Sequence, residues 1–99
     1  MFGDDLVVIR EKLSQEELLC QLAEEAAELA QAALKLRRAY STVNPTVVGK
    51  ATAYQNLKEE IADVMLLVYA LGLDGHTPEY SQMMNYKADR WCKRLNREV

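Results

Sequence analysis

Two short segments of this sequence carry carboxylates at the spacing of a helix turn. Residues 24–28 read Glu-Glu-Ala-Ala-Glu, and residues 60–63 read Glu-Ile-Ala-Asp. Side chains three or four residues apart are neighbours on an α-helix, so each segment places two carboxylates side by side. Hard divalent cations prefer carboxylate oxygens, and the chemistry that these residues could support is therefore binding of Mg²⁺ or Mn²⁺.

Both segments fall on the apolar faces of their expected helices. Glu25 lies within a stripe of leucines at spacings of four and seven, namely Leu18, Leu22, Leu29 and Leu36. Glu60 lies three residues after Leu57 and four before Val64, and Asp63 lies four residues before Leu67. A single glutamate on a helical protein is more often a solvated surface charge. Paired acids on the apolar faces of two consecutive helices instead favour a shared site.

Four converging carboxylates, Glu25, Glu28, Glu60 and Asp63, require a counter-charge. Two unit charges about 4 Å apart repel by about 4 kcal/mol at an effective dielectric constant near 20. Net stabilities of domains are only about 5–15 kcal/mol, so we expect a bound cation to offset this repulsion. A carboxylate-bridged di-iron centre normally uses Glu-x-x-His motifs, and the only histidine, His76, falls in an expected loop. The di-iron alternative is therefore rejected.

The distribution of Gly, Pro and capping residues predicts an all-α fold with three main helices. Their expected ranges are about 14–40, 51–71 and 78–96. Ser14 and Glu17 are expected to form a capping box at the N-terminus of the first helix, and Gly72 is expected to end the second helix. Thr77 is expected to cap the third helix, with Pro78 at its first position. Strand-like residues occur only at 6–9, and the 40–50 segment is expected to be a loop whose role is open.

Length and composition indicate one cytoplasmic domain that spans residues 1–99. The longest nearly uncharged apolar run, 64–73, is shorter than the roughly 18–20 residues that cross a membrane, and residues 1–10 lack a signal-peptide pattern. Cys20 and Cys92 are interpreted as free thiols in a reducing compartment. The net charge of −3 argues against binding of a nucleic acid polymer.

The length of the first expected helix predicts assembly. At about 1.5 Å per residue it would extend roughly 39 Å, whereas the radius of gyration of a 100-residue globule is near 13 Å. Such a helix protrudes from a compact monomer. We therefore expect a helical bundle completed by oligomerisation, as a homodimer or homotetramer.

The acidic segments resemble the signature of the MazG-like all-α nucleoside triphosphate pyrophosphatases, which is Glu-Glu-x-x-Glu on one helix and Glu-x-x-Asp on the next. The likeness covers roughly residues 18–94. It implies hydrolysis of (d)NTP to (d)NMP and pyrophosphate. It also implies Mg²⁺ ligation, with Mn²⁺ as an alternative, by Glu25, Glu28, Glu60 and Asp63. The resemblance implies that Glu24 either helps to ligate the metal or positions the attacking water. Glu24 and Glu25 are the candidate catalytic residues, and which acid activates the water stays open.

The last helix of this family carries cations that contact the substrate's phosphates. The matching residues here are Lys87 and Arg90, followed by Arg94, while Asp89 stands where an asparagine is frequent. An equally good interpretation is that these basic side chains form a solvated face of the helix. The base-binding residues are unknown, because the aromatic candidates are more often core residues. These candidates are Tyr54, Tyr69, Tyr86 and Trp91.

Two functions are compatible with these patterns. The favoured one is a Mg²⁺-dependent nucleotide pyrophosphohydrolase. The alternative is a non-catalytic helical interaction module that binds a basic partner in its acidic groove. Base and sugar preference, and a house-cleaning or a signalling role, are not determined by the sequence.

Overall fold

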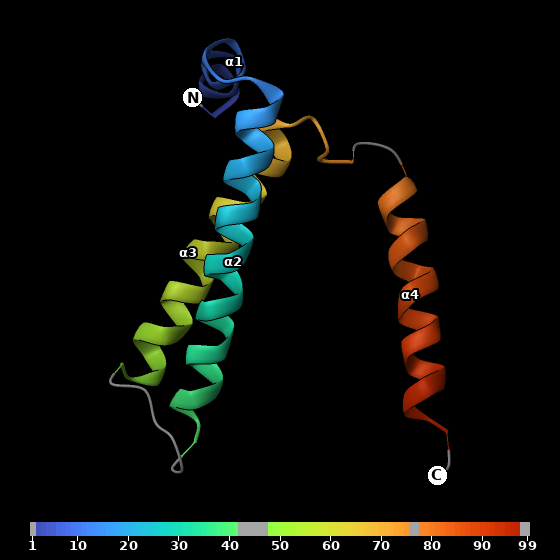
Figure 1. The fold of residues 1–99 in the computed structure, drawn as a ribbon. Helices are drawn as coiled ribbons and strands as arrows, with labels where there is room; N and C mark the ends of the chain where they lie inside the picture. Colours follow the sequence, from blue (N-terminus) through green and yellow to red (C-terminus); the bar gives the residue numbers. More distant parts are fainter. Residues whose placement is uncertain (1, 42–47, 76–77, 98–99) are drawn as a thin grey trace.

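The structure, a computed structural model, describes residues 2–41, 48–75 and 78–97, and these ranges contain helices and no strand. The helices are α1 (Phe2–Lys12), α2 (Gln15–Ala39), α3 (Lys50–Ala70) and α4 (Glu79–Leu95), as Figure 1 shows. The expected all-α fold is confirmed, and α1 is an additional helix that the sequence pattern does not predict. None of these described helices has the length and apolar character needed to span a membrane.

The centre of the molecule is an antiparallel hairpin of α2 and α3, which lie side by side along their length (Figure 1). Near the start of α2, Leu18 packs with Leu67 and Ala70 of α3 in a small apolar cluster. Towards the other end, Ala32 and Ala53 are buried. Small side chains at these two positions allow the helices to approach closely, which holds the acidic middle of each helix opposite the other.

The ends of the hairpin helices follow the local signals in the sequence. The Ser14 side chain accepts a hydrogen bond from the backbone N–H of Glu17, and the Glu17 carboxylate accepts one from the backbone N–H of Ser14. The predicted capping box is thus confirmed. At the end of α3, Gly72 has a φ of 72°, and the N–H of Leu73 donates to the carbonyl of Val68. This left-handed glycine ends the helix as predicted.

The additional helix α1 packs against the end of α3. Leu6 is buried in the apolar cluster, and Ile9 packs beside it. The Arg10 guanidinium donates hydrogen bonds to the backbone carbonyls of Tyr69 and Ala70. These carbonyls belong to the last turn of α3, which has no basic residue of its own. Arg10 therefore supplies the positive charge that the C-terminal end of the α3 dipole favours.

Helix α4 stands apart from the hairpin and is joined to it by the connection after α3 (Figure 1). It has no buried residue. The radius of gyration is 17.4 Å, well above the roughly 13 Å of a compact 100-residue globule. Helix α4 begins at Glu79, one residue later than expected, and Pro78 occupies its cap position. Thr77, the expected cap, and His76 lie outside the described residues.

We predict that Arg10→Gln lowers the free energy of unfolding by about 1–2 kcal/mol, because two charge-assisted hydrogen bonds to the end of α3 are lost. Urea denaturation followed by circular dichroism measures this change. Lys12→Gln removes the same charge from the same helix and serves as the matched control. An equal loss in both variants would show that Arg10 acts only through its net charge.

Candidate metal centre

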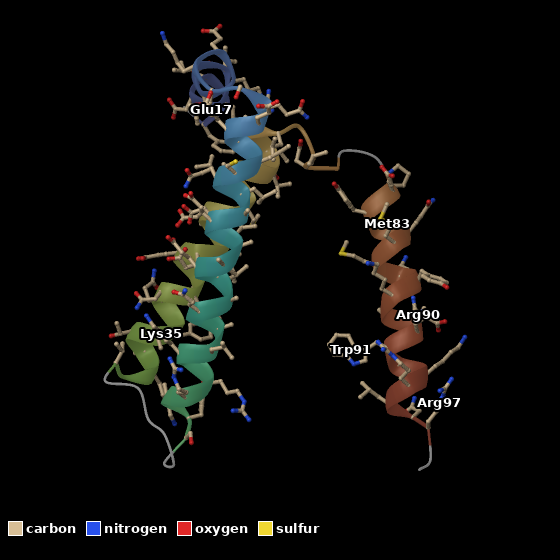
Figure 2. All side chains as sticks on the ribbon, in the orientation of Figure 1. Glu17, Lys35, Met83, Arg90, Trp91 and Arg97 are labelled. Atoms are coloured by element: carbon tan, nitrogen blue, oxygen red, sulfur yellow. The ribbon has the colours of Figure 1, made fainter. Side chains whose placement is uncertain are left out.

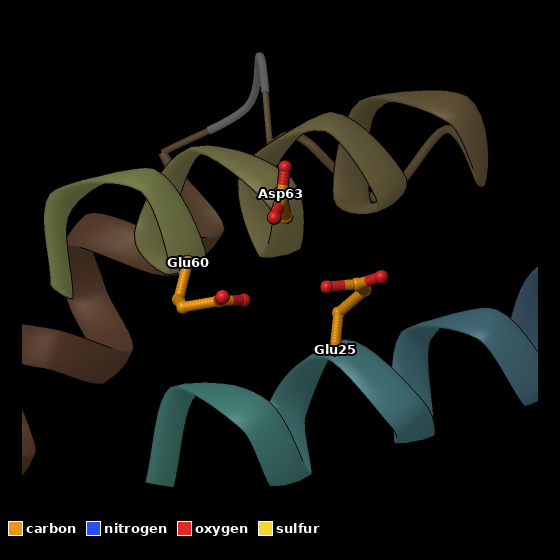
Figure 3. Close-up of side chains that lie close together, drawn as sticks. All are labelled: Glu25, Glu60 and Asp63. Atoms are coloured by element: carbon orange, nitrogen blue, oxygen red, sulfur yellow. The ribbon is translucent and has the colours of Figure 1, made fainter. Parts of the chain in front are cut away.

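Three carboxylates converge in the middle of the hairpin. Glu25 projects from α2 towards α3, and Glu60 and Asp63 come from α3 (Figure 3). One oxygen of each carboxylate lies within 4.8 Å of the others. Glu25 and Glu60 are half-buried, whereas Asp63 is exposed at the edge of the group. We call these three residues the acidic group. Both acidic segments of the sequence therefore contribute to one place in the fold.

The acidic group contains buried oxygens without a protein partner. Among the described residues, Oε2 of Glu25 and Oε2 of Glu60 are shielded from solvent and accept no hydrogen bond. A shielded carboxylate oxygen without a partner loses its hydration without compensation. A cation between the two helices would provide that compensation. The oxygen-only donor set is the type that Mg²⁺ and Mn²⁺ bind, so these residues fit such an ion.

Gln21 orients one member of the acidic group. Its side-chain Nε2 donates a hydrogen bond of 3.0 Å to Oε1 of Glu25, one turn further along α2. This bond uses one oxygen of the carboxylate and leaves Oε2 directed to the interior. Sequence reasoning missed Gln21. Gln21 could have been found from its spacing of four residues from Glu25, because this spacing allows a hydrogen bond between the two side chains on a helix.

Glu28 interacts electrostatically with two members of the acidic group, Glu25 and Glu60. Its pKa is raised above the ordinary 4.5, first by repulsion from Glu25, then by a hydrogen bond with Glu25 and by repulsion from Glu60. Its side chain is exposed, and it lies outside the three-residue acidic group. The structure thus places three of the four predicted ligands together, with the fourth at their border.

The pKa of Glu60 is also raised. Partial burial between the helices is the main cause, and repulsion from Asp63 and Glu25 adds to it. A hydrogen bond with Glu28 acts in the opposite direction and lowers this pKa. Without a cation, the mutual repulsion of these carboxylates therefore opposes the ionisation of Glu60. Glu24 is exposed and is not among the converging residues.

The predicted phosphate-binding residues lie on a different part of the molecule. Lys87, Arg90 and Arg94 line a shallow hollow of about 260 Å³ beside Trp91 on α4. Figure 2 shows Arg90 and Trp91 on the helix that stands apart from the hairpin. Asp89 forms an ion pair of 3.0 Å with Lys93 one turn away. Within one chain these cations are not brought to the acidic group.

The remaining predicted residues divide between core and surface. Tyr69 packs on the apolar cluster, and its ring meets that of Phe2 edge to face at 5.5 Å between centroids. Tyr54, Tyr86 and Trp91 are exposed. Cys20 and Cys92 are free and exposed, as expected.

Comparison of the chain with protein-family models, curated proteins and solved structures gives no match. The resemblance to MazG-like pyrophosphatases therefore rests on the two acidic motifs. In the structure these two motifs face each other from α2 and α3.

We predict that, with chelator present, the stability advantage of Glu28→Gln over the wild type grows with pH. A raised pKa means that the folded state binds more protons than the unfolded state above pH 4.5. The wild-type carboxyl is therefore neutral in both states at low pH, and its destabilising effect grows as pH rises from 4.5 towards its folded pKa and is complete above that value. The variant cannot acquire this charge.

Urea denaturation between pH 4.5 and 7 measures the difference between the two proteins. Glu11→Gln, an exposed change on α1, is the control and should differ from the wild type by an amount that hardly depends on pH. A pH-independent difference for Glu28→Gln would contradict the repulsion described above.

Proposed function

We propose that this protein is a Mg²⁺-dependent nucleotide pyrophosphohydrolase that cleaves (d)NTP to (d)NMP and pyrophosphate. The observation that carries the proposal is the convergence of Glu25, Glu60 and Asp63 from two facing helices, with shielded oxygens that lack a partner. The likeness of both motifs to the MazG-like signature supports the choice of reaction. Mn²⁺ is an alternative ion.

In this proposal, Glu25, Glu28, Glu60 and Asp63 hold the cation. When bound, the ion supplies positive charge that polarises phosphoryl oxygens and aligns the substrate. Glu24 and Glu25 orient the attacking water through hydrogen bonds to their carboxylates. The water oxygen bonds to the α-phosphorus as the bond from that phosphorus to the α–β bridging oxygen breaks. Pyrophosphate departs with the bridging oxygen, and the proton lost from water passes to a carboxylate and then to solvent.

Assembly is the second part of the proposal. The exposed side chains of Tyr80, Met84, Trp91 and Leu95 fall on one face of α4 at helical spacing. A solitary helix of this length is marginal in water, and most helical stability in proteins comes from packing an apolar face. We propose that α4 packs on the hairpin of a second copy, in a homodimer or homotetramer.

Charge complementarity favours a second copy as the partner. Lys87, Arg90 and Arg94 lie along one flank of the apolar face of α4. The hairpin carries the acidic group. Packing between copies would bring these cations towards the acids of another chain, where a triphosphate needs both the metal and positive side chains.

We predict pyrophosphate as the primary phosphorus product when NTPs and dNTPs are incubated with the protein and Mg²⁺. Phosphorus NMR identifies the products and the preferred base in one experiment. Primary release of orthophosphate would refute cleavage between the α- and β-phosphates.

We predict that Glu28→Gln and Asp63→Asn each reduce turnover by about two orders of magnitude or more, because a metal-binding oxygen is lost while shape is kept. Glu16→Gln, an exposed change in the first turn of α2, should keep near-normal turnover. Near-normal rates in the first two variants would assign both acids a structural role.

A cation-dependent melting temperature separates the enzyme from the alternative, an acidic interaction module. A metal that binds only the folded state at a hundredfold excess over its Kd stabilises by about 2.7 kcal/mol. We predict that Mg²⁺ or Mn²⁺ raises the melting temperature, that chelator lowers it, and that Glu25→Gln gains less from the metal. Na⁺ at matched ionic strength controls for screening. A wild type that responds equally to Na⁺ and Mg²⁺ would favour the interaction module.

We predict a mass in light scattering of at least twice 11.2 kDa at micromolar concentration. Trp91→Glu should reduce it, since a charge would enter the apolar face of α4. Gln82→Glu is the control, because it adds the same charge at an exposed position on the opposite side of α4. A monomeric wild type would overturn the shared bundle.

A further inference from the structure

A groove of about 310 Å³ adjoins the acidic group on the side of the connection between α2 and α3. Glu28 and Glu60 line its end nearest the acidic group, so the groove and the group share a border. Gln31 and Lys35 line it from α2, and Figure 2 shows Lys35 on the half of α2 nearest that connection. Neither Gln31 nor Lys35 was predicted as a site residue from the sequence.

The floor and the opposite side of the groove come from small and polar residues. Ala32 and Ala53 form the floor and are 7% and 2% exposed. Asn56 and Glu59 line the α3 side. A floor of methyl groups between two polar rims is a shape that a flat ring can enter, with hydrogen-bonding groups at its edges.

The charges of the groove decide which part of a nucleotide it suits. Its lining includes three carboxylates, Glu28, Glu59 and Glu60, and one ammonium group, Lys35. Glu28 and Glu60 belong to the proposed cation site at one end, so the rest of the lining, with Glu59 and Lys35, has no net charge that would attract a phosphate. A neutral heterocycle suits such a lining, and it needs both donors and acceptors of hydrogen bonds. The amides of Gln31 and Asn56 provide both kinds of group.

The size of the groove is consistent with one nucleoside. Small-molecule sites commonly have volumes of about 300–1,000 Å³, and this groove lies at the lower end of that range. It would accept a single base with its sugar and not a dinucleotide. The triphosphate of such a ligand would then extend across Glu28 and Glu60 to the acidic group.

We propose that this groove is the nucleoside subsite, in which Gln31 and Asn56 hydrogen-bond the edge of the base above the floor of Ala32 and Ala53. The placement of the phosphates on the acidic group rests on the proposed pyrophosphohydrolase function. Binding of the nucleoside itself does not. The two amides are specificity-determining residues, and they make no contact with the reacting phosphorus.

Steady-state kinetics with two substrates tests the subsite. Gln31→Leu and Asn56→Leu each remove an amide while keeping a similar side-chain size. For the preferred nucleoside triphosphate, each should raise KM roughly tenfold or more, with a much smaller change in kcat. The KM for inorganic tripolyphosphate, which has no base, should change far less. Gln55→Leu, next to Asn56 but outside the groove lining, is the matched control. Equal losses on both substrates would overturn the subsite.

A binding experiment keeps the two proposals separate. Uncharged adenosine, guanosine, cytidine and uridine are titrated into metal-free wild-type protein, and side-chain amide signals are followed by NMR. Shifts of the Gln31 and Asn56 amides that saturate with one nucleoside, and that are absent at Gln55, support the subsite even if no triphosphate is hydrolysed. Absence of such shifts with all four nucleosides overturns it, even in a protein that hydrolyses triphosphates.

Discussion

Repulsion among carboxylates held between two helices is the constraint on which this structure depends. Glu25, Glu60 and Asp63 approach one another only because apolar contacts fix α2 against α3 on both sides of them. A pair of like charges about 4 Å apart costs about 4 kcal/mol at a dielectric constant near 20. This repulsion is also a cause of the raised pKa values of Glu28 and Glu60. A divalent cation would offset it.

The structural features that the sequence predicts are those that depend on residues close to one another in the chain. The capping box at Ser14 and the left-handed Gly72 bound the hairpin helices because each acts within a few residues of itself. Glu25, Glu60 and Asp63 could be placed on facing surfaces because they interrupt apolar stripes. Helical periodicity predicted that each pair of acids shares a face, and the structure shows that the two faces meet.

The features that sequence reasoning missed depend on contacts between distant residues. Helix α1 is short and contains Val7 and Val8, whose branched side chains favour strands, so its helical state follows from packing of Leu6 and from Arg10. Arg10 contacts a carbonyl 60 residues away, and no local pattern encodes that bond. The groove residues Gln31 and Asn56 were also missed. Polar residues on helices usually face solvent, and no local pattern shows that these two line one groove from different helices.

The separation of α4 has a consequence for how stability is distributed in the molecule. Amide hydrogens in the middle of α2 and α3 are protected by a packed partner helix, so their exchange with solvent requires the hairpin to open. Those of α4, which has no buried residue, need only the fraying of one helix. Hydrogen exchange in a single chain would therefore be fast in α4 and slow in the hairpin. In an assembled protein the protection of α4 would become a function of protein concentration, as would the resistance of this helix to proteases.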